Sequence, residues 1–328
     1  MSFRPPLVVR LRNWVGDVVL GVPALTRLAA SHDLRLVGKG WAADLLAGHG
    51  WPVHKLPATW RERVALFRRL ANEARAQDPG FDRRLNAVCF PYSFSSALEF
   101  RLAGLRAIGH AYEGRSLLLS RAVPRPQGVH ELKVYEHLAS ALLGQEAPAP
   151  ERIGLALAPR HRDEAAALRE AHGIAPGFVV VCPFAGGTWS KQPKTWPDFA
   201  AFVAEELPRF GRQVLICPGP GEEPIAHGQF ASAICLERVG LGAYAALLAD
   251  SALMISNDTG PGHIAAAVGA PLLSVLGPSD PAQWGAWGPN VRFLRGAEGA
   301  WPEREAVRDA VAAALAAPTP PAGPPAPG

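Results

Sequence analysis

Short apolar runs alternate with amphipathic helical segments along most of the chain, and this alternation constrains the fold more than any other feature. Residues 7–11 (LVVRL) read as a buried strand, and residues 17–30 read as a helix with apolar side chains at helical spacing. Similar pairs follow, joined by short connections. A βαβα pattern of this kind predicts a parallel sheet covered by helices on both faces.

The expected elements form two series. In the first, strands are expected at 7–11, 34–37, 53–56, 85–90 and 107–109, and helices at 17–30, 41–47, 61–75, 95–103 and 130–143. In the second, strands are expected at 178–182, 213–217, 233–236, 252–255 and 272–276, and helices at 160–172, 196–207, 243–248, 260–268 and 303–316. Residues 144–159 are rich in Pro and Ala and separate the two series. We therefore predict an α/β chain with one domain over 1–155, a second over 156–316 and a disordered Pro- and Ala-rich tail over 317–328.

The composition is typical of a protein with a large core. Of the 328 residues, 48% are hydrophobic and 19% are charged. No apolar run approaches the roughly 20 residues of a membrane span, and the first apolar run is too short for a signal peptide. The four cysteines lack both a CxxC pairing and a histidine at ligand spacing. We therefore expect free thiols in a cytosolic protein.

Charge is distributed unevenly along the chain. Residues 1–150 hold 20 Lys and Arg against 12 Asp and Glu, whereas residues 151–328 hold 13 against 17. A basic first half favours an anionic partner such as a phosphorylated substrate, a membrane surface or a nucleic acid, although solvated arginines alone would give the same count. No nucleic-acid-binding motif accompanies the arginines, so we expect no nucleic acid.

The stretch from Asp258 to His263 follows an apolar run and opens a helix of small residues. Asp258 or Thr259 suits the N-cap position, and Gly260 lets another molecule approach the backbone. The free N–H groups of such a turn suit a phosphate, which His263 could also reach. A carboxylate repels a diphosphate, so we expect Asp258 to cap the helix while Thr259, Gly260 and His263 face the ligand. The alternative is a capped turn without a ligand.

Two further loops in the second half carry polar groups that suit a nucleotide. The loop 183–197 contains Thr188 and Lys194 among small residues, the ingredients of a diphosphate site. Glu222 follows the next strand and suits ribose hydroxyls, although an acid favoured by a helix dipole is an equal alternative. The patterns DxD and HExxH and any Cys/His cluster are absent, so we expect no metal and no cofactor.

In the first half, the loop Asn13-Trp14-Val15-Gly16-Asp17 follows the first strand. Asp17 at a helix start is either an N-cap or a general base at the edge of the sheet. Its helix-terminal position should lower its pKa.

Taken together, four motifs resemble those of the ADP-heptose:lipopolysaccharide heptosyltransferases, glycosyltransferase family nine. The motifs are NWVGD (13–17), K-x-W-P (194–197), NDTGPxH (257–263) and GPSDP (277–281). The resemblance runs from about residue 7 to residue 315, and the NWVGD form is similar to the second heptosyltransferase of the core pathway. It implies the GT-B architecture, in which two Rossmann-like domains with parallel sheets face each other across a cleft. The implied reaction is inverting, metal-independent transfer of heptose from ADP-heptose to the lipopolysaccharide inner core.

The resemblance also implies roles for individual residues. Asp17 matches the proposed base and Lys194 the lysine at the donor phosphates, so that these two are the expected catalytic residues. The expected donor-binding residues are Thr188, Lys194, Glu222, Asp258, Thr259, Gly260 and His263. A phosphorylated lipid A–core acceptor would place the protein at the cytoplasmic face of the inner membrane as a peripheral protein. The expected acceptor or membrane contacts are Arg61, Arg63, Arg68 and Arg69.

Two alternatives remain open. One is the same fold acting with another nucleotide sugar on a surface glycan. The other is a catalytically silent paralogue that binds a sugar nucleotide, against which the presence of both Asp17 and Lys194 argues.

Overall fold

A computed structural model describes residues 3–185, 188–189, 192–277 and 279–317. The chain forms two compact units, Met1–Pro150 and Glu151–Gly328, called unit 1 and unit 2 below. The division falls inside the Pro- and Ala-rich segment 144–159. Of the tail expected to be disordered, all but Ala317 lies outside the described residues.

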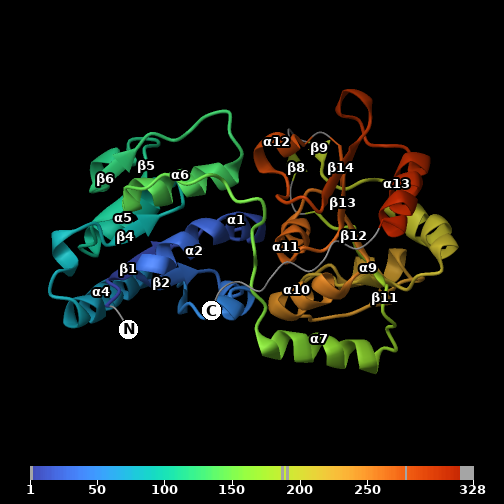
Figure 1. Ribbon diagram of the computed structural model, residues 1–328, viewed down its shortest axis with the longest axis horizontal. Coiled ribbons are helices and arrows are strands. Elements are labelled where there is room, and N and C mark those ends of the chain that lie inside the picture. Colours follow the sequence, from blue (N-terminus) through green and yellow to red (C-terminus); the bar gives the residue numbers. More distant parts are fainter. Residues whose placement is uncertain (1–2, 186–187, 190–191, 278, 318–328) are drawn as a thin grey trace. The chain divides into compact units, whose positions relative to one another are not determined.

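Unit 1 contains a six-stranded parallel sheet in the order β3-β2-β1-β4-β5-β6 (Figure 1). Its strands are β1 (Pro6–Arg10), β2 (Asp33–Gly38), β3 (Val53–Lys55), β4 (Ala87–Cys89), β5 (Ala107–His110) and β6 (Arg121–Val123). Its α-helices are α1 (Val15–Leu20), α2 (Val22–Ser31), α3 (Ala42–Leu45), α4 (Trp60–Gln77), α5 (Phe94–Leu102) and α6 (Glu131–Leu143). Short 3-10 turns lie at Ala47–His49, Phe81–Arg83 and Arg115–Leu118.

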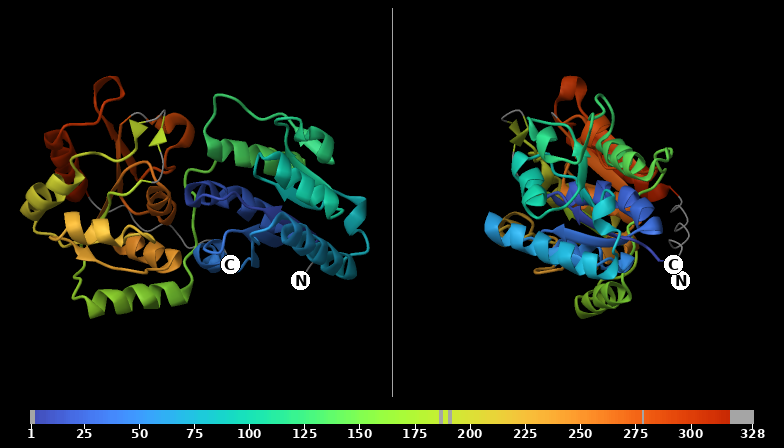
Figure 2. Two further views of the ribbon diagram at one scale, coloured as in Figure 1. Left: turned by 180° about the vertical axis from the view of Figure 1, so that it is seen from behind. Right: turned by 90° about the vertical axis from the view of Figure 1, so that its left-hand side faces the viewer.

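Helices cover both faces of this sheet (Figures 1 and 2). On one face, α4 and α5 pack together through Phe67 and Phe100, whose rings meet edge to face at 4.6 Å between centroids. Helices α2 and α6 pack together on the other face. Every residue of β1 is buried, as a central strand covered on both sides requires.

Unit 2 repeats this plan in its own sheet, in the order β11-β10-β7-β12-β13-β14. Its strands are β7 (Val179–Cys182), β10 (Val214–Ile216), β11 (Ile234–Cys235), β12 (Leu253–Ser256), β13 (Leu272–Leu276) and β14 (Val291–Arg295), with a separate hairpin of β8 (Thr188–Trp189) and β9 (Gln192–Pro193). Its α-helices are α7 (Pro159–Ala171), α8 (Phe199–Ala201), α9 (Glu223–Gln229), α10 (Leu241–Asp250), α11 (Gly260–Val268), α12 (Pro281–Trp284) and α13 (Arg304–Ala316). A π-helical turn spans Phe202–Glu206, and 3-10 turns span Leu207–Phe210 and Ala297–Gly299.

Both sheets have the strand order 3-2-1-4-5-6 of a Rossmann fold. In such sheets the order reverses between the first and fourth strands, and ligands bind beyond the carboxyl ends of the strands at that point. The relevant strands are β1 and β4 in unit 1, and β7 and β12 in unit 2. Loops that follow these four strands are therefore the places to look for function.

Two expected helices differ from the observed ones, and two observed strands were not expected. The single helix over 17–30 is wrong, because the chain forms α1 and α2 with a break at Gly21, where Pro23 cannot donate to the turn before it. The helix over 196–207 begins later, at Phe199, since Pro197 disfavours a helical conformation at the residue before it. Strands β6 and β14 were not expected, because they lie at sheet edges and several of their residues face solvent instead of forming an apolar run.

Among the helices that the structure describes, none is both long enough and apolar enough to cross a membrane.

Candidate active site

The turn from β12 into α11 carries four of the expected donor-binding residues. Thr259 is the N-cap of α11 and has an extended backbone. Gly260 is the first helical residue, and His263 is buried in the first turn. The close fit of this turn requires Gly262, since a Cβ there would lie 2.8 Å from the Ser256 hydroxyl. The turn thus presents the N-terminus of a nine-residue helix beyond the carboxyl end of β12.

The expected capping role of Asp258 is wrong. Thr259 holds the N-cap position, and its hydroxyl makes no capping hydrogen bond. Instead, Oδ2 of Asp258 lies 3.9 Å from Nζ of Lys194, and the Asp258 carboxylate also accepts from Ser279. Burial raises the pKa of Asp258, while Lys194 and the Ser279 hydrogen bond act in the opposite direction. Asp258 therefore orients the lysine instead of the helix.

Asn257 joins the turn to the loop that carries Lys194. Its side chain is fully buried, its Oδ1 accepts from the backbone N–H of Trp196 at 2.9 Å, and its Nδ2 donates to the carbonyl of Pro183 at 3.0 Å. These two contacts hold both ends of the loop 183–196, which leaves β7 and carries Lys194. The sequence motif contains Asn257, but the bridge depends on contacts that its spacing does not reveal.

Two further expected donor-binding residues belong to neighbouring segments. Thr188 lies in β8, where its backbone pairs with Pro193, and its side chain falls outside the described atoms. Glu222 precedes α9 and accepts from the backbone N–H of Gly219 at 2.8 Å. Burial raises the pKa of Cys182 at the end of β7 to about 12, and the nearby Glu222 charge adds to the rise. Glu222 is therefore close to the end of β7.

Asp17 is the third residue of α1, beyond the carboxyl end of β1. Its side chain is only 14% exposed, and Oδ1 accepts from Nη1 of Arg12 at 3.0 Å. The expected lowering of its pKa is wrong. Burial raises the pKa of Asp17, and this effect exceeds the opposing attraction of Arg12.

Arg12 is itself fixed by residues that the sequence motifs do not contain. Its second Nη donates to Glu131, which is fully buried and also accepts from the Tyr92 hydroxyl at 2.6 Å and from Arg125 at 2.8 Å. The Arg12 guanidinium lies 4.0 Å from the centroid of the Tyr92 ring. Arg12, Tyr92, Arg125 and Glu131 are called the Glu131 cluster below. Because Arg12 and Glu131 are 119 residues apart, sequence spacing gave no signal for the pairing.

The four arginines expected to contact an acceptor or membrane lie on α4. Arg63 is bound to Glu99 and to the carbonyls of Pro57 and Ala58. The other three are exposed: Arg68 donates to the Leu102 carbonyl, Arg69 is 3.8 Å from Glu73, and Arg61 makes no ion pair with any described residue. Three of the four therefore have partners within unit 1.

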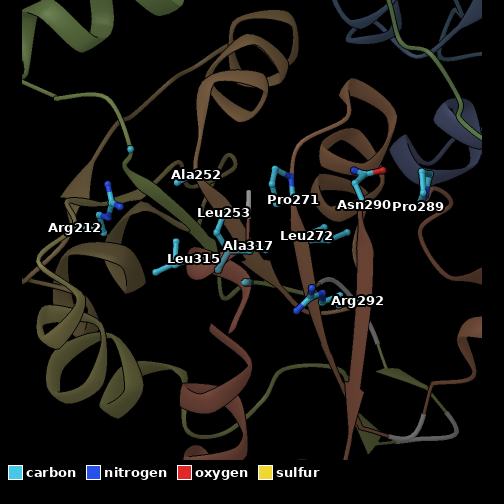
Figure 3. A pocket seen from close by; sticks show the side chains of 12 residues that line it. Arg212, Ala252, Leu253, Pro271, Leu272, Pro289, Asn290, Arg292, Leu315 and Ala317 are labelled. Carbon is cyan, nitrogen blue, oxygen red and sulfur yellow. The ribbon is translucent and has the colours of Figure 1, made fainter. Parts of the chain in front are cut away.

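A cavity of about 370 Å³ in unit 2 contains none of the expected donor residues in its lining (Figure 3). Its lining includes the amino ends of strands, such as Leu253 at the start of β12 and Leu272 at the start of β13, and the last turn of α13. Arg212 and Arg292 also line it. Across the described residues, no group of three His, Cys, Asp or Glu side chains is placed to hold a metal ion.

The sequence of this chain is similar to those of known glycosyltransferases. A family model described as glycosyltransferase family 9 (heptosyltransferase) matches residues 67–312. Lipopolysaccharide heptosyltransferase 1 of Pseudomonas aeruginosa is 30% identical over 295 residues, which cover 84% of this chain and 79% of that protein. Lipopolysaccharide heptosyltransferase 3 of Escherichia coli K12 is 30% identical over 139 residues, 37% of either chain.

Solved structures share the fold along nearly the whole chain. The structure of Escherichia coli ADP-heptose lipopolysaccharide heptosyltransferase II has a TM-score of 0.76 at 21% identity and covers 94% of this chain and 98% of its own. A family 9 glycosyltransferase from Veillonella parvula has a TM-score of 0.79 at 15% identity, with 96% and 98% covered. These similarities confirm the predicted two-domain α/β fold of the GT-B type. From the extent of the family match and the identity to the Pseudomonas protein, the chain belongs to glycosyltransferase family 9, the heptosyltransferase family, and is a glycosyltransferase.

Proposed function

We propose that this enzyme transfers heptose from ADP-heptose to the inner core of lipopolysaccharide, with inversion at the anomeric carbon and without a metal ion. The observation that carries the proposal is Asp17, a largely buried carboxylate beyond the carboxyl end of β1. Its pKa is raised by burial, and its Oδ1 is held by Arg12. A raised pKa makes Asp17 a better base than an exposed aspartate, and the Arg12 contact fixes its orientation.

In the proposed reaction, Asp17 removes the proton from an acceptor hydroxyl while the oxygen attacks the anomeric carbon of heptose. The bond between that carbon and the diphosphate oxygen breaks, and ADP leaves from the opposite face. Lys194 and the N–H groups at Thr259 and Gly260 stabilise the charge that develops on the diphosphate. Asp258 supports this role because it keeps the lysine beside the turn.

We also propose that the two units bind different substrates. Unit 1 would bind the acceptor. Unit 2 would bind the donor, through Thr188, Glu222 and His263 as well as Lys194. A phosphorylated lipid A–core acceptor suits the basic unit 1. Exposed Arg61, Arg68 and Arg69 on α4 would then face the acceptor or the anionic inner leaflet, where the protein acts as a peripheral protein of the cytoplasmic side.

The test is transfer by purified enzyme to a core acceptor that lacks heptose, with ADP-heptose compared against other ADP, UDP and GDP sugars. We expect ADP release only with ADP-heptose, an inverted anomeric configuration by NMR, and activity in the presence of EDTA. Asp17→Asn should lower kcat by at least about 100-fold, the lower end of the range for a general base. Activity with a different donor alone, or undiminished turnover by Asp17→Asn, contradicts the proposal.

A further inference from the structure

The large exposed apolar side chains of unit 1 are gathered at one edge of its sheet. Most of the strongly exposed ones lie in segments that follow the carboxyl ends of β1, β3, β4 or β5, and these are Trp14, Trp60, Phe94, Tyr112 and Leu117. Two others belong to the part of unit 1 that the structure describes: Phe3 precedes β1, and Leu102 ends α5. In a parallel sheet the carboxyl ends share one edge. Trp14, Trp60, Phe94 and Tyr112, which lie within five residues of a strand end, are therefore on the same side as Asp17, whereas Leu117 lies on the turn that leads towards β6.

Trp14 is the most informative of these residues. Its side chain is 75% exposed although it belongs to the N-cap residue of α1, three residues before Asp17. An N-cap is normally Ser, Thr, Asp or Asn, whose side chain accepts from the first free N–H groups, and Trp14 makes no such bond. The indole thus contributes neither to the cap nor to the core. Its position next to Asp17 is therefore better explained by a ligand than by folding.

Tyr112 is connected to Asp17 by a continuous set of contacts. Arg12 binds Asp17 and lies over the ring of Tyr92, and the Tyr92 ring is 5.8 Å from that of Tyr112. The Glu131 cluster fixes Arg12 and Tyr92, whereas the Tyr112 side chain is exposed. An exposed aromatic ring supported by fixed neighbours loses little side-chain entropy when it binds a ligand.

We propose that Trp14 and Tyr112 form an aromatic platform that binds the sugar rings of the acceptor beside Asp17. This inference rests on the proposed function. The C–H faces of pyranose rings pack against aromatic rings, whereas their hydroxyls bind polar groups, so separate exposed rings among arginines suit a saccharide. Trp14 would align the acceptor ring whose hydroxyl gives its proton to Asp17, and Tyr112 would hold the neighbouring ring.

Two variants of Trp14 separate binding from folding. Trp14→Ala removes the ring, and Trp14→Asn also supplies a side chain that can cap α1. We expect both to weaken binding of a delipidated core oligosaccharide by about tenfold, the typical scale for truncating a Trp hot spot. The melting temperature of Trp14→Asn should equal or exceed that of the wild type. Phe3→Ala is the matched control, because Phe3 is 67% exposed in the same unit but precedes β1.

The measurements are calorimetric binding of the oligosaccharide without donor, steady-state KM for acceptor and for ADP-heptose, and co-sedimentation with anionic vesicles. Acceptor KM should rise in both Trp14 variants and in Tyr112→Ala, with KM for ADP-heptose unchanged. Equal oligosaccharide affinity in the wild type and the Trp14 variants overturns the proposed platform. A loss seen only in vesicle binding also overturns it, because Trp14 would then be a lipid contact. Wild-type enzyme without any heptose transfer would instead overturn the proposed function.

Discussion

The bridge made by Asn257 gives the sharpest prediction about the donor site. Asn257→Ala leaves two buried backbone groups without partners, the N–H of Trp196 and the carbonyl of Pro183. Each orphaned group costs about 1–3 kcal/mol, so the free energy of unfolding should fall by about 2–6 kcal/mol. The Trp196 side chain keeps its own hydrogen bond to the Pro302 carbonyl. The loop 183–196 should therefore detach from the Asn257 turn, while the Trp196 side chain stays in place.

Unit 1 contains a matched control for this variant. Asn86 is also fully buried, its Oδ1 accepts from the Arg106 N–H at 2.7 Å, and its Nδ2 donates to the Phe81 carbonyl at 3.0 Å. Asn86→Ala therefore removes the same pair of interactions at a site without a predicted donor contact. The two variants should lose similar stability in thermal or urea unfolding.

Binding of ADP should separate the two variants. Lys194 lies two residues before Trp196, so detaching the loop displaces the ammonium group from the turn. Loss of one hydrogen bond to a charged group costs about 1.5–3 kcal/mol, which raises Kd about 10- to 100-fold. We expect this rise by calorimetry for Asn257→Ala and no change for Asn86→Ala. Equal ADP affinities in both variants, at a temperature where both are folded, would refute the reasoning.

Three shorter predictions follow. If Asp17 is the base, activity falls as the pH drops through the pKa of Asp17. Because Arg12 lowers that pKa, Arg12→Met should move the acidic limb of the kcat/KM profile to higher pH. An unmoved limb contradicts the assignment of Asp17 as the base. Lys194→Ala should raise the Kd for ADP by at least about tenfold in calorimetry, and Lys194→Arg should keep part of the affinity. An unchanged ADP affinity in Lys194→Ala rules out the phosphate contact. Thr59→Ala removes the capping box of α4 and should lower the free energy of unfolding by about 0.5–2 kcal/mol, with an unaltered ADP Kd as its internal control.

Local patterns were enough to predict most of the fold. The strand starting near residue 7 and the helix over 260–268 appear close to their expected places, because each combines a clear apolar period with clear ends. Edge strand β14 was missed since it is mostly solvated and has no apolar run. The break at Gly21 was missed because helical periodicity continues across it.

The candidate site was only partly predictable, since motifs identify polar residues but not their partners. Asp17 and Lys194 stood out by their loops. Glu131, by contrast, comes from the start of a distant helix and becomes important only through its three contacts, two of which join it to residues far away in the sequence. The capping role assigned to Asp258 failed for a related reason. Residue preferences allow either Asp or Thr at an N-cap. The Asp258 carboxylate points towards Lys194 instead, and this contact in space is not visible in the sequence.

The Glu131 cluster also determines how charge changes during a turnover. With Asp17 ionised, the carboxylates of Asp17 and Glu131 balance the guanidinium groups of Arg12 and Arg125, so the group is formally neutral. When Asp17 accepts a proton, the same group carries one net positive charge in a largely buried environment. An uncompensated buried charge is costly, which favours prompt release of the proton. Once Asp17 loses the proton, Asp17 and the Glu131 cluster together return to neutrality before the next acceptor binds.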